Sequence, residues 1–151
     1  MARALAVGVL LAAALTGAGA SATPAKDCGD QLQFGYLRSL VHAKGHWQLR
    51  FDPALFTNGV TANAAAGQQV PNDNYVVNES KRTYLFYVSP TAHITVLTRK
   101  RYVDGVPIPV ATLAQLVAGK QPLKLFEPLE TGFWMRYHVD TACDLRQQYH
   151  P

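Results

Sequence analysis

The sequence has few of the residues and motifs that most catalytic and metal sites need. It contains 2 Cys, 2 Met and 2 Trp among 151 residues. Two cysteines cannot form a structural zinc site on their own, and there is no G-x-S-x-G elbow, glycine-rich phosphate loop or H-E-x-x-H motif. The motifs therefore disfavour an enzyme and give no reason to expect a cofactor, although distant carboxylates can still meet in a folded chain.

The chain also has only one long apolar run, and that run is too short to span a bilayer. It covers residues 4–15, follows the positive charge of Arg3 and precedes the small-x-small triplet at 20–22. This order is typical of a secretory signal peptide cleaved after Ala22. We therefore predict a signal peptide at 1–22, a flexible leader at 23–33 and one β-rich domain at 34–151, secreted and soluble with no transmembrane segment after cleavage.

The mature chain has only a small excess of charge. Of the 14 basic residues only Arg3 lies in the signal peptide, so 13 remain against 10 acidic residues, a net charge of +3. This excess permits an anionic partner without requiring one. In an oxidising compartment, Cys28 and Cys143 are most simply one disulfide that joins the two ends of the domain, and a free reactive thiol is the alternative.

Alternating apolar residues predict strands through most of the domain. In a first hairpin over residues 37–51, a three-residue loop at 44–46 sets Val41 opposite Leu49 and keeps one face apolar, whereas a two-residue turn sets Leu40 opposite Leu49. The three-residue loop is the prediction, with Asp52 and Pro53 ending the hairpin. A second, central hairpin pairs residues 83–88 with 93–98 through a loop at 89–92.

The remaining elements are shorter. The Asp104-Gly105 pair predicts a further tight turn, two helices are expected at 59–67 and 110–118, and strands are expected at 75–77, 132–139 and 142–149. The domain is thus mainly β with two short helices, which favours a small antiparallel β-barrel. The helix before the last strands favours an OB-like barrel, and an open antiparallel α+β sheet is the alternative.

The predicted second hairpin gathers positive charge at its open end, because its register places Arg82 opposite Arg99. Five basic residues then meet beside three aromatic residues, and they form a candidate anion-binding site: Lys81, Arg82, Arg99, Lys100, Arg101, Tyr84, Phe86 and Tyr102. Such a surface suits an anionic polymer, an envelope surface or nucleic acid. The alternative is a solvated strand end whose charges prevent edge-to-edge pairing.

Histidines give no metal site in this pattern. His42 and His46 have an H-x3-H spacing, but they fall on a hairpin and not on a helix, and no cysteine or carboxylate cluster accompanies them. His93 and His138 are single histidines in strands, which we expect to be packed or exposed and not catalytic.

Four segments of the mature chain resemble small exported actinobacterial proteins of unknown function: residues 51–66, 70–80, 131–134 and 144–151. The resemblance implies a single exported bacterial domain and carries no catalytic assignment. The leading hypothesis is a non-enzymatic binding or envelope-associated module that contacts an anionic ligand. The alternatives are a small extracellular hydrolase or lyase with its acids in a barrel mouth, and a secreted inhibitor or protein-interaction module presenting loops such as 68–74.

Overall fold

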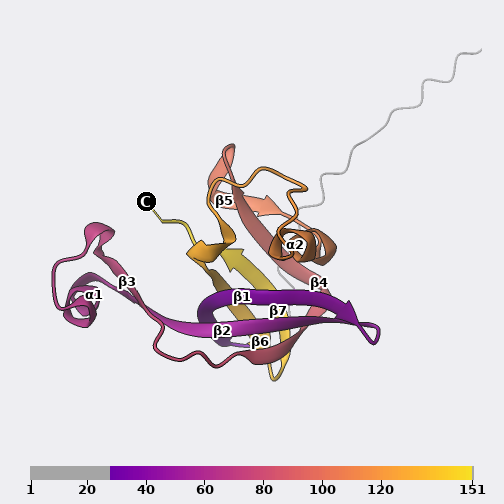
Figure 1. The fold of residues 1–151 in the computed structure, drawn as a ribbon, viewed down its shortest axis with the longest axis horizontal. Helices are drawn as coiled ribbons and strands as arrows, with labels where there is room; N and C mark the ends of the chain where they lie inside the picture. Colours follow the sequence, from indigo (N-terminus) through magenta and orange to yellow (C-terminus); the bar gives the residue numbers. More distant parts are fainter. Residues whose placement is uncertain (1–27, 151) are drawn as a thin grey trace, which may run out of the picture.

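The computed structural model describes residues 28–150, so the predicted signal peptide and the first part of the predicted leader lie outside the described residues. Figure 1 shows the chain. Its elements follow in this order: β1 (Gln31–Ala43), β2 (His46–Asn58), α1 (Gly59–Ala66), η1 (Pro71–Asp73), β3 (Asn74–Val77), β4 (Tyr84–Thr98), β5 (Arg101–Pro107), α2 (Val110–Val117), η2 (Leu129–Thr131), β6 (Phe133–His138) and β7 (Thr141–Gln147). No helix among these residues is long and apolar enough to cross a membrane.

Five of the strands close into a barrel, which confirms the predicted fold class. The order around the barrel is β1-β2-β4-β7-β6, and β6 pairs with β1 to complete the circle. Every one of these contacts is antiparallel except that between β4 and β7, which is parallel. The extra strands β3 and β5 pair with β2 and β4, and β3 projects away from the barrel together with α1 (Figure 1).

Apolar side chains fill the barrel and account for its stability. The side chains with no exposed surface include Leu49, Phe51, Val96, Phe133, Met135 and Leu145. Helix α2 adds Leu113 and Leu116 to the same core and packs against β1 and β4. It lies between Pro109 and Gly119, the two residues whose backbone preferences predicted its ends.

The first hairpin has the two-residue turn, so the predicted three-residue loop is wrong. Leu40 pairs with Leu49 and is buried, whereas Val41 is 50% exposed. The cause is a β-bulge at Arg38, which inserts one residue and shifts the inward-facing alternation of β1. Lys44 and Gly45 have φ angles of 53° and 80°, as a two-residue turn between right-twisted strands requires.

The predicted second hairpin does not exist, because residues 84–98 form the single strand β4. Residues 89–92, the predicted loop, are where β4 changes partner. Before them β4 pairs with β2, beyond them it pairs with β5, and the register with β7 shifts at the same place. Pro90 has no N–H to donate, and it lies in this gap in the pairing. The proline marks a change of partner and not a turn.

Pro53 likewise lies where its strand, β2, changes pairing partner along one edge. The strand continues through it to Asn58, although the sequence predicted that the hairpin ends there. Pairing with β4 stops at Phe51 and pairing with β3 starts at Leu55, so the missing N–H of Pro53 again falls between two partners.

The predicted turn at Asp104 and Gly105 is also wrong. Both residues lie inside β5, and the turn between β4 and β5 is at Arg99 and Lys100. The register of β5 shifts along β4, so residues 102–105 bulge out of the ladder and Gly105 takes a φ of 73°. The bulge leaves Tyr102 exposed on the surface.

The other predicted elements are confirmed, with small changes at their ends. These are α1, which ends at Gly67 in the left-handed conformation, and the strands β3, β6 and β7. The disulfide between Cys28 and Cys143 is confirmed too, with 5.5 Å between its Cα atoms. However, β1 already begins at Gln31, so the leader prediction is wrong for residues 31–33.

Val139, in the turn between β6 and β7, has a φ of 55° and is 75% exposed. A left-handed backbone costs an ordinary residue about 1–2 kcal/mol, and asparagine tolerates it better. We therefore expect Val139→Asn to raise the free energy of unfolding in urea by about 1 kcal/mol. The control is Val60→Asn, at an 86% exposed valine of α1, because the two residues have similar helix propensities. Equal values for wild type and Val139→Asn would contradict the prediction.

Candidate functional site

The five predicted anion-binding cations do not converge. Lys81 and Arg82 precede β4, whereas Arg99, Lys100 and Arg101 follow its last residue, so the two groups lie at opposite ends of a 15-residue strand. The prediction of one site depended on the second hairpin and is wrong with it. All five side chains are exposed, and none of them has an ion pair or side-chain hydrogen bond within residues 28–150.

The three predicted aromatic partners do not form one exposed surface either. Phe86 points into the barrel and is half-buried, with ring-centroid distances of 6.1 Å to Phe51 and 4.9 Å to Tyr137. Tyr84 is 51% exposed and lies at the Arg82 end of β4. Tyr102 is at the other end of the strand.

Tyr102 belongs to a cluster of three aromatic residues, two exposed and one half-buried, that the sequence did not predict. Its ring centroid lies 5.5 Å from that of Phe126 and 6.0 Å from that of Tyr149, and the last two are 6.3 Å apart. Phe126 is fixed beside β4 by a hydrogen bond from its N–H to the carbonyl oxygen of Leu97, at 2.8 Å. The three rings come from β5, from the segment after α2 and from the C-terminal segment, so no local pattern relates them.

The three cations of the β4–β5 turn directly precede Tyr102 in the chain, so this turn and the rings belong to the same end of β4. We call the surface made by these six residues the basic–aromatic platform: Arg99, Lys100, Arg101, Tyr102, Phe126 and Tyr149. A fourth cation, Lys124, flanks it, because the next residue, Leu125, forms a β-bridge with Thr98 at the end of β4.

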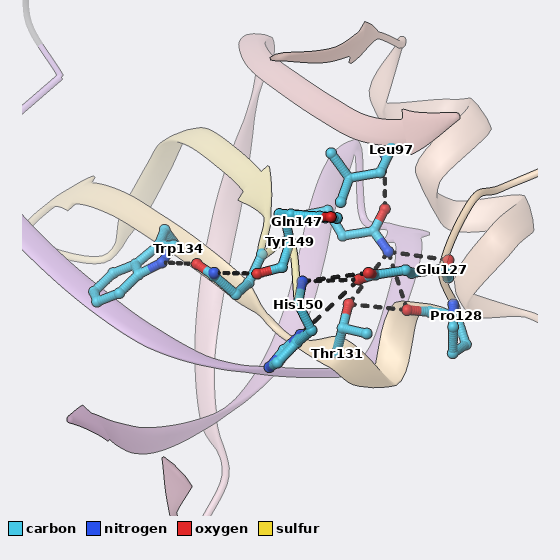
Figure 2. Close-up of polar contacts among 9 residues, drawn as sticks. Leu97, Glu127, Pro128, Thr131, Trp134, Gln147, Tyr149 and His150 are labelled. Atoms are coloured by element: carbon cyan, nitrogen blue, oxygen red, sulfur yellow. Dashed lines mark hydrogen bonds and ion pairs between the residues drawn. The ribbon is translucent and has the colours of Figure 1, made fainter. Parts of the chain in front are cut away.

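Gln147 holds the C-terminal part of the platform in place (Figure 2). Its side chain is buried, and its oxygen accepts a hydrogen bond from the N–H of Leu97 at 2.9 Å. Its amide nitrogen donates to the carbonyl oxygens of Glu127 and Pro128, at 3.1 and 3.0 Å, and to the hydroxyl of Thr131 at 3.3 Å. One amide thus joins β7, β4 and the segment that carries Phe126.

The next residues extend this network to the chain end. The indole N–H of Trp134 donates to the Gln148 side-chain oxygen at 2.6 Å, and the N–H of His150 donates to the Glu127 carboxylate at 3.3 Å. Tyr149 lies between these two anchors in the chain, so its backbone is held on both sides. The sequence offers no local signal for this network of hydrogen bonds.

A second group of polar residues surrounds the bulge of β1. Asp52 is 3% exposed, and its Oδ2 accepts hydrogen bonds from two nitrogens of Arg38, with 2.9 Å to Nε, and from Asn78 at 3.3 Å. The guanidinium carbon of Arg38 lies 5.3 Å from the centroid of the Tyr36 ring. Burial raises the pKa of the Tyr36 phenol above 10.0, the charge of Arg38 opposes the rise, and the charge of Asp52 adds to it.

The histidines have partners that the sequence did not predict. His93 Nδ1 lies 2.9 Å from Oδ1 of Asp144, whose Oδ2 accepts from Nε of Arg146 at 2.8 Å. This chain of polar contacts joins β4 to β7. His42 contacts Trp47 and His46 contacts Tyr87 through their rings. Within residues 28–150, no three His, Cys, Asp or Glu side chains group closely enough to hold a metal ion.

No protein-family model, curated protein or solved structure matches the chain.

The raised pKa of Tyr36 predicts a pH dependence of stability. The folded protein keeps the phenol proton to a higher pH than the unfolded chain, which loses it near 10.0. The resulting stabilisation is fully present below about pH 10 and is lost as the pH rises through the folded value. We therefore expect the free energy of unfolding of Tyr36→Phe to fall less steeply above about pH 10 than that of the wild type. Urea unfolding over a pH series measures this.

The control for the loss of one hydroxyl is Tyr75→Phe on β3, away from Arg38 and Asp52. If the free energy of unfolding falls equally steeply above about pH 10 in Tyr36→Phe and in Tyr75→Phe, the pKa of Tyr36 is not raised in the folded protein.

Proposed function

We propose that the protein is an exported, non-enzymatic module that binds an anionic polymer through the basic–aromatic platform. One observation carries this proposal. Three consecutive cations, Arg99, Lys100 and Arg101, have no ion-pair partner among the described residues and directly precede Tyr102, whose exposed ring contacts two further aromatic rings. Neighbouring like charges repel one another, and an anionic ligand relieves that repulsion.

The platform has the chemistry that a chain of phosphate or carboxylate groups requires. Arginine can donate two parallel hydrogen bonds to one such group, and lysine adds a point charge. The faces of Tyr102, Phe126 and Tyr149 offer stacking area to the sugar or base units between the charged groups. A polymer also fits an exposed surface, along which it can make several weak contacts at once.

Export is supported by the disulfide and by the sequence. Disulfides persist in oxidising compartments, and Cys28–Cys143 closes nearly the whole described chain. The predicted signal peptide lies outside the described residues. The resemblance to small exported actinobacterial proteins favours the same compartment, in which the anionic polymer is a component of the cell envelope.

We also propose that the barrel is OB-like. Counted along the chain, its five strands have the order 1-2-3-5-4, and α2 lies between the third and fourth of them. OB barrels bind oligonucleotides and oligosaccharides on the face of their second and third strands, which are β2 and β4 here. That face exposes Arg50, Leu85 and Tyr87, and it adjoins Lys81 and Arg82. It is the second candidate surface for the same polymer.

Two matched double variants separate these surfaces. Arg99→Gln with Arg101→Gln neutralises the platform, and Lys81→Gln with Arg82→Gln removes the same charge at the other end of β4. With inorganic polyphosphate as the probe, we expect only the first variant to bind more weakly. Its plot of log affinity against log salt should become shallower by about one unit for each cation removed.

The outcomes of this titration decide between the surfaces. A loss confined to Lys81→Gln with Arg82→Gln would move the site to the β2–β4 face. Equal losses would show that binding follows net charge alone and would overturn the platform. Co-sedimentation of the same variants with isolated actinobacterial cell envelope tests whether the polymer is an envelope component.

A further inference from the structure

An open groove of about 710 Å3 lies between β1 and residues 116–130, and it suggests a ligand of another kind. It shares Phe126 with the platform, but the three cations of the β4–β5 turn do not line it. A volume of this size is typical of sites for small molecules, which span about 300–1,000 Å3.

The floor of the groove is apolar. Its leucines also pack against the barrel core, so their inner sides are buried while their outer sides face the groove; they are Leu37, Leu116, Leu123, Leu125 and Leu129. An alkyl chain laid on this floor would remove apolar surface from water on both sides of the contact.

Charged side chains of both signs line the groove. Arg38, Lys120 and Lys124 line it together with Glu127 and Glu130. Arg38 is ion-paired with Asp52, and the Glu127 carboxylate accepts the N–H of His150 at 3.3 Å, whereas neither lysine has an ion-pair partner among residues 28–150. The two lysines are therefore the cations of the groove that have no carboxylate partner in the described part of the chain, and an anion can pair with them.

Arg38 is the best oriented of these cations. Two of its nitrogens bond to the buried carboxylate of Asp52, and its guanidinium carbon lies 5.3 Å from the centre of the Tyr36 ring. Its third nitrogen, Nη1, has no hydrogen-bond acceptor among residues 28–150. A side chain held in this way keeps its remaining donors in a fixed direction, which lowers the entropic cost of binding a ligand group.

We propose that this groove binds a small amphipathic anion, an alkyl chain that carries one carboxylate or phosphate group. The charged group lies at Arg38, Lys120 and Lys124, and the chain lies on the leucine floor. The inference goes beyond polymer binding and does not depend on it. The shared chemistry has two sources, a fatty acid or a lipid phosphate, which the probes below distinguish.

The test is calorimetric titration of the disulfide-bonded protein with decanoate, with decyl phosphate and with their shorter homologues down to the hexyl compounds. We expect one molecule to bind per chain, with affinity rising about three- to fourfold for each methylene added between the hexyl and decyl compounds. Lys120→Gln with Lys124→Gln should weaken binding about five- to tenfold. Tighter binding of decyl phosphate indicates the lipid phosphate, and tighter binding of decanoate indicates the fatty acid.

Two controls keep the test specific. Lys44→Gln with Lys81→Gln removes the same charge from outside the groove and should leave the affinity unchanged, as should Arg99→Gln with Arg101→Gln. Arg38→Lys keeps the charge beside Asp52 but loses the fixed donors, so it should weaken binding while the protein stays folded.

Three results would overturn the inference. They are equal affinity for decanol, equal affinity for acetate or inorganic phosphate, and binding that the Lys120 and Lys124 substitutions leave unchanged. If these ligands do not bind as expected while polyphosphate still binds, the proposal for the groove is wrong and the proposal for the platform is unaffected.

Discussion

The barrel depends on the pairing of one long strand. β4 pairs with β2 along one edge and with β7 along the other, and its far half also carries β5. Without these contacts β2 and β7 would both be open edges, and the apolar interior would face water. The strand can serve so many partners because it changes from one to the next near Pro90, where no backbone N–H is available to donate.

The same strand decides how positive charge is distributed. In a hairpin the two basic segments would meet at one end, but in a continuous strand they lie at opposite ends. Each group then has its own aromatic neighbours, Tyr84 at one end and Tyr102 at the other. The molecule thus has two separate basic surfaces of similar composition and not one dense patch. The surface around Tyr102 also gains the rings of Phe126 and Tyr149 from distant parts of the chain.

Local patterns predicted those features that depend on local physics. The ends of α2 follow from Pro109 and Gly119, and the inward residues of β6 follow from simple alternation. The prolines at 53 and 90 misled the prediction, because a proline reports a missing donor and not the reason why the donor is missing. Likewise the bulge at Arg38 has no signature of its own, yet it shifts the alternation of the first hairpin and sets Leu40 inside the barrel.

Each candidate site likewise combines residues that a local pattern reveals with residues that only the fold brings together. The run Arg99–Lys100–Arg101 is visible in the sequence, whereas Phe126 and Tyr149 come near it through contacts between distant segments, among them those of Gln147 and the bond from Phe126 to Leu97. The orientation of Arg38 in the groove depends on Asp52, a residue that the sequence predicted to end the first hairpin. In the fold it is a buried carboxylate that orients the bulged Arg38.

The two proposed sites use positive charge in different ways. The platform cations are exposed and unpaired, so salt screens their attraction for a ligand over about one Debye length, roughly 8 Å at physiological ionic strength. They suit many weak contacts along a polymer. Arg38 is held by a buried partner over an aromatic ring, so its contribution is directional and belongs to one ligand group at a time. A leucine floor beside a directed cation favours an apolar chain with one charged end, whereas the platform, with rings next to a run of cations, favours a polymer of repeating charged units.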